Sequence, residues 1–155
     1  VGENRSEFGG SLYMKEICGV VAGVLPKIDY ENELSLWELV IEANKRGILE
    51  SAKDISSGGA AIALAKMAAV SGLGCDAIMS IDDTRDIFSE SFSRAILEIS
   101  AENCAAFEGM TSGLMYQRIG EVGGSEFRLN DVSMNLQELQ NIYFSRFAEV
   151  VESDI

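Results

Sequence analysis

Apolar residues recur at helical spacing in several parts of the chain. In residues 33–45 they stand at positions i, i+3, i+4 and i+7, the spacing of an amphipathic helix, and Gly47 follows as its C-terminal stop. Residues 60–70 are rich in alanine and apolar on nearly every side, which is typical of a helix buried between layers. We also expect a short helix over residues 101–110 and a long terminal helix over residues 133–150.

Short apolar runs between polar turns predict the strands. Gly123-Gly124 separates two such runs, and we expect a β-hairpin there because paired glycines suit a two-residue turn. Residues 12–17 fit either a strand or a short helical turn. The expected strands are residues 49–55, 75–81, 94–100, 116–122 and 126–129.

The alternation of helices and strands predicts a fold of the α/β (α+β) class. A hairpin requires antiparallel pairing, so a mixed sheet covered by helices fits this order better than a doubly wound parallel sheet. The 155 residues, of which 47% are hydrophobic, suffice for one domain with its own core but not for two full domains. We expect this domain over residues 11–155, after a linker loop over residues 1–10 that leads into it.

The charge balance and the length of the apolar runs exclude nucleic acids and membranes as partners. The formal net charge is −13 and the twelve lysines and arginines are dispersed, whereas nucleic acids and anionic membranes attract basic surfaces. No apolar run is long enough to span a bilayer and the N-terminus lacks a signal-peptide pattern, so we expect a cytoplasmic location. Because the chain begins at Val1 rather than Met, we expect either processing or, in preference, a fragment of a longer protein.

The chain contains no histidine, which excludes histidine-dependent nucleophile triads, histidine-ligated zinc and histidine general bases. The three cysteines, Cys18, Cys75 and Cys104, are odd in number, far apart and in apolar surroundings. We expect them to be reduced and buried rather than joined in a disulfide or a metal cluster.

A polar turn that ends in two glycines, Ser56-Ser57-Gly58-Gly59, runs directly into the predicted helix of residues 60–70. Glycine lets the backbone approach an anion closely, and the free N–H groups of a first helical turn supply donors and positive potential. The turn is therefore a candidate phosphate site. The alternative is an ordinary helix start with Ser56 or Ser57 as the N-cap.

Three short segments stand out together. They are Phe8–Lys15, Lys53–Gly59 with Gly72 and Gly74 after its helix, and Asp86–Arg94. In this order and at this spacing they resemble the C-terminal half-domain of phosphoribosylformylglycinamidine synthase, in the aminoimidazole ribonucleotide synthetase-like superfamily. The usual family patterns are His-Asp-x-Ser-x-Gly-Gly-Leu around the second segment and Leu-Phe-Ser-Glu-Ser-x-x-Arg around the third. The resemblance covers nearly the whole chain.

The resemblance implies a three-layer α/β/α unit with a mixed sheet of partly ferredoxin-like topology. It implies that the full-length protein is a ligase of purine biosynthesis, which uses ATP, Mg²⁺ and ammonia to convert formylglycinamide ribonucleotide to the amidine. The implied partners are the preceding ATP-binding half-domain of the same chain, a glutaminase subunit and a small bridging subunit. This chain would be the second copy of a repeated half, without a complete active site and without a bound cofactor. A homodimer through surface that the missing half would cover stays open.

The same resemblance implies candidate substrate- or phosphate-binding residues, in a second-repeat site that faces a non-turnover nucleotide in the family. Glu90 and Ser91 match a segment that helps to hold the nucleotide substrate in the first repeat. The other candidates are Gly9, Gly10, Ser11, Asp54, Ser56, Ser57, Gly58, Gly59 and Arg94. Lys53 stands where the family commonly has His, and Ser57 stands where an acidic residue is frequent. No catalytic or metal-binding residue is expected in this chain.

Several of these candidates also have a purely structural interpretation. Glu90 and Arg94 would form an i,i+4 surface pair worth about 0.3–0.5 kcal/mol. Asp54 would order the glycines through an Asx turn. Lys53 would be either a phosphate contact or a solvated lysine beside the turn.

Two other groups of residues have open interpretations. Asp82, Asp83 and Asp86 would either chelate a hard cation or form a solvated loop. Aromatic residues at helical spacing are expected in core or interdomain contacts, and these are Trp37, Phe144 and Phe147.

Two other functions remain alternatives. One is another enzyme of the same superfamily, of the selenophosphate, thiamine-phosphate or hydrogenase-maturation type, although these lack the Phe-Ser-Glu-Ser-x-x-Arg pattern in this form. The other is a non-enzymatic interaction module, which the acidic composition and the absence of histidine favour.

Overall fold

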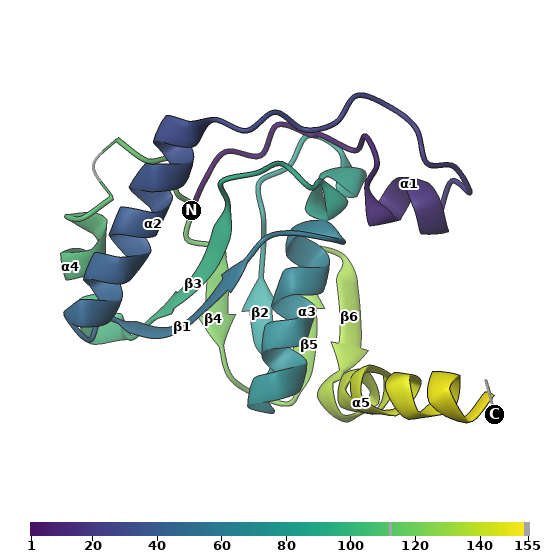
Figure 1. Cartoon of the computed structure of the whole chain (residues 1–155). Coiled ribbons are helices and arrows are strands. Elements are labelled where there is room, and N and C mark those ends of the chain that lie inside the picture. Colours follow the sequence, from purple (N-terminus) through teal and green to yellow (C-terminus); the bar gives the residue numbers. More distant parts are fainter. Residues whose placement is uncertain (112, 154–155) are drawn as a thin grey trace. The chain divides into compact units, whose positions relative to one another are not determined.

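The computed structural model describes residues 1–111 and 113–153, with side chains up to residue 145. The chain divides into two compact units, each with its own sheet (Figure 1). Unit 1 comprises Val1–Ala63 and Ile81–Gln117, and unit 2 comprises Leu64–Ser80 and Arg118–Ile155. Helices combined with a mixed sheet confirm the predicted α+β class.

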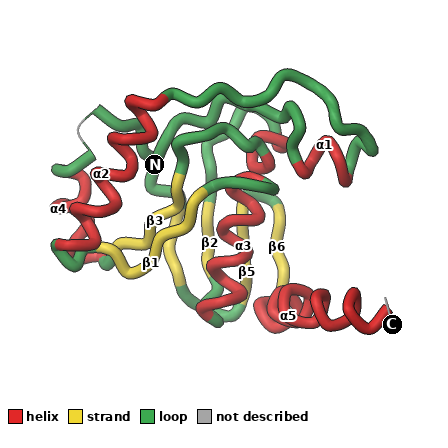
Figure 2. The backbone as a smooth tube through the Cα atoms, in the orientation of Figure 1, coloured by secondary structure: helices red, strands yellow, loops and turns green. Residues whose placement is uncertain are grey.

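Unit 1 contains a two-stranded antiparallel sheet and most of the helices (Figure 2). β1 (Leu49–Asp54) pairs with β3 (Ala95–Ile99), with a register shift between Leu49 and Ser51. The helical elements are α1 (Leu12–Glu16), α2 (Tyr30–Lys45), the first turn of α3 (Gly59–Ser71), η1 (Thr84–Phe88), η2 (Ala101–Asn103) and α4 (Cys104–Glu108).

The core of unit 1 forms where α2 and α4 meet. Leu39 and Ala43 lie one turn apart on α2, so their side chains share a face, and they pack with Ile48 and Phe107 in one buried cluster. This arrangement confirms the amphipathic helix that the apolar spacing of residues 33–45 predicts.

The helix α2 begins three residues earlier than its apolar spacing predicts, because Asp29 caps it. The Asp29 Oδ1 accepts hydrogen bonds from the backbone N–H groups of Glu31 at 3.0 Å and Asn32 at 3.1 Å. The helix ends before Gly47, which adopts φ +67°, a conformation that favours glycine.

We expect Asp29→Ala to lower the free energy of unfolding by about 1 kcal/mol, because two N–H groups of the first turn lose their acceptor. Urea unfolding followed by circular dichroism measures this loss. Asp131→Ala removes an exposed carboxylate elsewhere and serves as the control. Equal effects of the two substitutions would show that Asp29 is not a cap.

Unit 2 contains a four-stranded mixed sheet in the order β4-β2-β5-β6. β2 (Cys75–Ala77) pairs antiparallel with β4 (Gly120–Val122) and parallel with β5 (Glu126–Leu129). β5 also pairs antiparallel with β6 (Val132–Asn135), and α5 (Leu136–Ser153) follows directly. The parallel and antiparallel pairs together confirm the prediction of a mixed sheet.

The hairpin predicted at Gly123-Gly124 is wrong. β2 lies between β4 and β5, so the two strands that flank these glycines are not neighbours. The Gly123 N–H donates to the Gly74 carbonyl at 2.8 Å, and the Gly74 N–H donates to the Gly124 carbonyl at 3.1 Å. The glycines therefore carry the chain past β2, over two strand spacings or roughly 10 Å, instead of reversing it.

The hairpin of this unit joins β5 to β6 at Asn130-Asp131. Asn130 adopts φ +51°, which asparagine tolerates, and its side chain exchanges two hydrogen bonds with the backbone of Met79. Because β6 takes residues assigned to the terminal helix, the helix predicted over residues 133–150 is wrong at its start, and α5 begins only at Leu136.

Residues 12–17 take the helical alternative, as α1. Three other elements differ from their predicted bounds. The strand predicted over residues 75–81 ends at Ala77, the strand predicted over residues 116–122 begins only at Gly120, and the helix predicted over residues 101–110 divides into η2 and α4.

Some side chains predicted to be buried are exposed. Cys18 is exposed and Cys104 is half-buried, so only Cys75 follows the expectation for the cysteines. Trp37 and Phe144 are exposed, so they do not belong to a core and their expected role in interdomain contacts stays a prediction, whereas the side chain of Phe147 lies outside the described residues. Within residues 1–111 and 113–153, no helix is both long and apolar enough to cross a membrane.

Candidate functional site

Three segments far apart in the sequence meet at the Glu90 carboxylate in unit 1. Its Oε1 accepts a hydrogen bond from the backbone N–H of Gly58 at 2.7 Å and another from the backbone N–H of Leu12 at 2.8 Å. Gly58 belongs to the serine-glycine turn, Leu12 to the Phe8–Lys15 segment, and Glu90 to the third segment. The fold therefore joins the three segments on which the resemblance rests.

The anion at the serine-glycine turn is thus a side chain of the protein itself. The first N–H groups of a helix attract negative charge, and here the Glu90 carboxylate accepts the Gly58 N–H. The Gly59 N–H donates to the Ser56 carbonyl at 2.9 Å. Phosphate binding at this turn stays a prediction, and binding through the Gly58 N–H requires the Glu90 carboxylate to move away.

The two glycines of the turn are required by neighbouring atoms of the chain. Gly59 has φ +67°, and a Cβ there would lie 2.5 Å from the Phe88 carbonyl carbon and 2.6 Å from the Ile87 oxygen. Gly58 has φ +86°, and a Cβ there would lie 2.4 Å from the Cγ1 of Ile62. The absence of side chains here permits close packing within the protein, independently of any ligand.

The glycine-rich lead-in segment also has partners within the protein. A Cβ at Gly9 would lie 1.8 Å from the carbonyl oxygen of Val24, so this glycine lets two backbone segments touch. Gly10 adopts φ +70°. The buried Ser11 caps α1, since its Oγ accepts the Met14 N–H at 3.2 Å.

A buried pair of serine hydroxyls ties the third segment to the N-terminal residues. The Oγ atoms of Ser89 and Ser91 lie 3.1 Å apart and accept the backbone N–H groups of Glu7 at 3.0 Å and Arg5 at 3.2 Å, respectively. Only Ser91 was expected at the site. The two-residue spacing was the available signal for Ser89, because alternate residues of an extended segment share a side.

Arg94 is buried and does not pair with Glu90, so the predicted surface ion pair is wrong. Its Nη1 donates to the Ser89 carbonyl at 3.2 Å. Burial and the nearby charge of Arg5 lower the pKa of Arg94 to about 10, although Asp86 opposes the shift. Arg94 thus holds the backbone of the third segment from inside the unit.

Lys53 and Asp54 pair with each other at the end of β1. The hydrogen bond from Lys53 lowers the pKa of Asp54, desolvation opposes this shift, and the Ser56 hydroxyl adds to it. The Ser56 interaction is with its side chain, whereas an Asx turn needs a backbone N–H as donor, so the turn expected of Asp54 stays a prediction. Neither interpretation of Lys53 included its pairing with a carboxylate.

The acidic residues before β3 form a helix cap. Asp83 accepts the Arg85 N–H at 2.8 Å and Asp86 accepts the Asp83 N–H at 3.2 Å, which makes a capping box for η1. Hydrogen bonds from Arg85 lower the pKa of Asp83 to about 2. Asp86 is buried, so the solvated-loop interpretation is wrong for it. Among the described residues, no group of three or more acidic or cysteine side chains could hold a metal ion.

Glu7 is part of this centre, although no motif in the sequence marks it. Its carboxylate accepts hydrogen bonds from the Arg5 Nε at 3.1 Å and from the Lys27 backbone N–H at 3.2 Å. Burial raises the pKa of Glu7, but hydrogen bonds from Ser91, Lys27 and Arg5 outweigh it and hold the pKa below its usual range.

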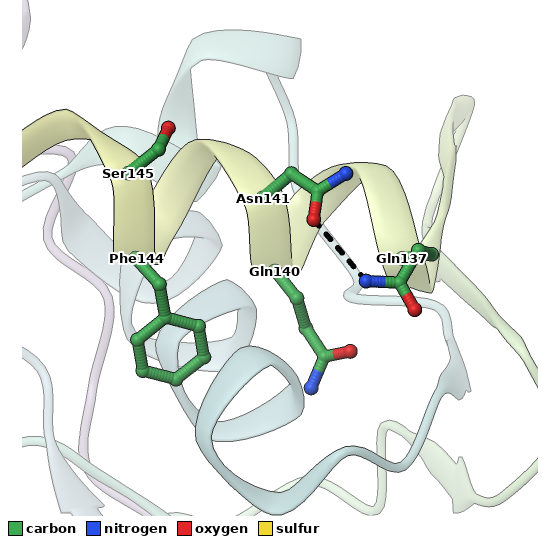
Figure 3. A pocket seen from close by; sticks show the side chains of 5 residues that line it. All are labelled: Gln137, Gln140, Asn141, Phe144 and Ser145. Carbon is green, nitrogen blue, oxygen red and sulfur yellow. Dashed lines mark hydrogen bonds between the residues drawn. The ribbon is translucent and has the colours of Figure 1, made fainter.

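Two surface hollows are lined by residues outside the three segments. One, of about 480 Å³, follows α5, and its lining is uncharged, with a hydrogen bond from Gln137 to Asn141 (Figure 3). The other, of about 470 Å³, is lined by residues of α2 and of the segment after α4. The first is lined by Gln137, Gln140, Asn141, Phe144 and Ser145. Neither hollow is lined by a residue of the three segments.

Comparison with known proteins agrees with these motifs. The family "AIR synthase related protein, C-terminal domain" matches residues 1–131. The chain is 68% identical over 155 residues to "Phosphoribosylformylglycinamidine synthase subunit PurL" of Sulfurimonas denitrificans and covers 21% of that protein. It is 50% identical over 157 residues to the protein of the same name from Nitratiruptor, again covering 21%. The chain therefore spans about a fifth of the length of these curated relatives.

Solved structures show the same fold at low sequence identity. T. maritima PurL complexed with FGAR has a TM-score of 0.73 at 22% identity, over 90% of this chain and 26% of that one. PurLQS from Thermotoga maritima has a TM-score of 0.64 at 19% identity, over 85% of this chain and 25% of that one. The chain belongs to the AIR synthase related proteins and represents their C-terminal domain.

Proposed function

We propose that this chain is the C-terminal domain of a phosphoribosylformylglycinamidine synthase of the PurL type. The whole protein would be the ATP-dependent ligase that converts formylglycinamide ribonucleotide and glutamine-derived ammonia to the amidine in purine biosynthesis. One observation carries the proposal: the motifs typical of that enzyme meet at Glu90, in a chain 68% identical over its whole length to a protein of that name.

On its own, this chain is expected to lack a complete site for ATP or Mg²⁺. The described residues hold no cluster of carboxylates suited to a cation, and the Gly58 N–H is engaged by Glu90. The sequence also lacks histidine for proton transfer. The proposed role is therefore to form one wall of a nucleotide site that the preceding ATP-binding half of the polypeptide completes, and no catalytic step is assigned to these residues.

Within this wall, the Glu90 centre acts by positioning. Its carboxylate sets the distance between the serine-glycine turn and the start of α1, while Ser89 and Ser91 hold the N-terminal segment. The likeness to a structure named PurLQS supports extending the proposal to a cytoplasmic complex with a glutaminase subunit and a small bridging subunit.

The decisive experiment assays the full-length protein with formylglycinamide ribonucleotide, Mg-ATP and ammonium, and follows the formation of ADP and the amidine. We expect both products from the full-length protein and neither from the 155-residue chain. Absence of the amidine from an active, nucleotide-hydrolysing preparation would overturn the proposal. Selenide and thiamine phosphate as replacement substrates test the related superfamily enzymes, and absence of any nucleotide dependence would favour an interaction module.

A further inference from the structure

The helix α2 carries a second apolar face, opposite the one that it buries. Four apolar residues recur at spacings of four, three and four positions and are between 51% and 74% exposed. At about 100° per residue, these positions fall within about 60° of one another around the helix. We call them the α2 stripe, and they are Tyr30, Leu34, Trp37 and Ile41.

The loop that leads into α2 is also rich in exposed apolar residues. Residues 17–29 connect α1 to α2 (Figure 1) and contain no helix or strand. Half of the residues between 17 and 28 are large, apolar and exposed, and they are Ile17, Val20, Val21, Val24, Leu25 and Ile28. A contiguous exposed apolar patch, such as the α2 stripe, marks an interaction surface, whereas single exposed apolar side chains do not.

Trp37, at the centre of the stripe, is held in a fixed position. Its Nε1–H donates to the Glu33 Oε1 at 2.7 Å, and the Ser93 hydroxyl donates to the Glu33 Oε2 at 2.6 Å. Glu33 therefore ties Trp37 to the segment before β3. Fixed tryptophan and tyrosine side chains dominate binding energies, because they bury a large area at little cost in conformational entropy.

The charged residues beside the stripe are mostly acidic. Glu31 and Glu38 lie along one side of it and Glu33 along the other. Glu42 lies on the first side but pairs with Arg46 at 2.8 Å, and Lys45 lies near the end of the helix. A second copy of this helix docked on the stripe would bring like charges together. Lysine or arginine beside an apolar ridge would instead match both the stripe and its rim.

We infer that the α2 stripe is a docking surface for another part of the same polypeptide, namely an apolar ridge flanked by lysine or arginine. The inference rests on that part of the proposed function which makes this chain one domain of a longer protein. The relatives are about five times as long as this chain, so four fifths of such a polypeptide lie outside it. A partner on the same polypeptide also binds at a high effective concentration, so docking on the four residues of the α2 stripe needs little affinity of its own.

Hydroxyl-radical footprinting of the purified full-length protein tests this inference at Trp37. We expect Trp37 to be oxidised at least tenfold more slowly in the folded protein than in urea, at every protein concentration. An exposed fraction of 58% alone would slow oxidation only about twofold, and that result would overturn the inference. Protection that disappears on dilution would indicate a second copy, and protection that requires an added subunit would indicate a separate partner; each outcome contradicts docking within one polypeptide.

Two lysine substitutions on the same helix supply the matched control. Ile41→Lys places a charge within the stripe, whereas Ser35→Lys places it at an exposed position outside the stripe. We expect Ile41→Lys to raise the oxidation rate of Trp37 in the full-length protein at least threefold, and Ser35→Lys to leave it unchanged. Equal rates would contradict the inference. Amidine formation by the same preparation separates the two claims, since an inactive protein with a protected Trp37 would overturn only the proposed function.

Discussion

Gly59→Ala is expected to lower the free energy of unfolding by about 2–4 kcal/mol, from backbone strain and steric overlap together. Gly59 has φ +67°, a region that costs a residue with a Cβ about 1–2 kcal/mol. The new Cβ would also lie 2.5 Å from the carbonyl carbon of Phe88, which is backbone and cannot rotate away. Urea unfolding of the variant and the parent measures the difference.

Gly47→Ala is the control that separates the two contributions. Gly47 has the same φ of +67°, but a Cβ there would meet nothing within 4 Å. We expect it to lose only the strain energy, about 1–2 kcal/mol. If the two variants lose the same stability, the close approach of Gly59 to Phe88 contributes nothing to the loss. Glycine would then be needed at position 59 only for its positive φ.

The long elements were predictable because their signals are local. The apolar residues of α2 recur with the helical period, and Gly47 after it adopts the left-handed conformation of a helix stop. The alanine-rich α3 likewise buries most of its residues, as its composition indicates. Such signals need no knowledge of the rest of the chain.

The strand order of unit 2 was not predictable in this way. Glycines at 123–124 suit a hairpin turn and a crossing past another strand equally well, and only the pairing of β2 with both neighbours decides between them. That pairing joins residues about fifty positions apart. β6 was missed because four residues are too few to reveal alternation, and their pattern continues into α5.

The candidate site was predictable in its segments but not in its contacts. The resemblance selected the three segments that meet at Glu90, yet the contact between Gly58 and Glu90 spans 32 positions and depends on the fold. Ser89 and Glu7 were missed because a buried serine and a hydrogen-bonded loop carboxylate have no sequence pattern of their own. The acceptor that fills the glycine turn is therefore a structural finding.

Glu90→Ala is expected to lower the free energy of unfolding by about 2–3 kcal/mol, because the N–H groups of Gly58 and Leu12 lose a charged acceptor. Gly58 is buried, so water replaces that acceptor poorly. Glu90→Gln keeps an oxygen at the same position and loses only the charge, so we expect a loss of about 1 kcal/mol. Urea unfolding of both variants measures these values.

Glu98→Ala is the matched control for the Glu90 variants, since the Glu98 carboxylate accepts one side-chain hydrogen bond, from the Ser51 hydroxyl at 2.7 Å. We expect it to cost no more than about 1 kcal/mol. A loss as large as that of Glu90→Ala would deny Glu90 any special role in joining the segments.

Inorganic phosphate separates the two interpretations of the serine-glycine turn. If phosphate raises the melting temperature of Glu90→Ala more than that of the parent, the turn binds phosphate once the Glu90 carboxylate is removed. If phosphate has no such effect, the serine-glycine turn binds only the Glu90 carboxylate.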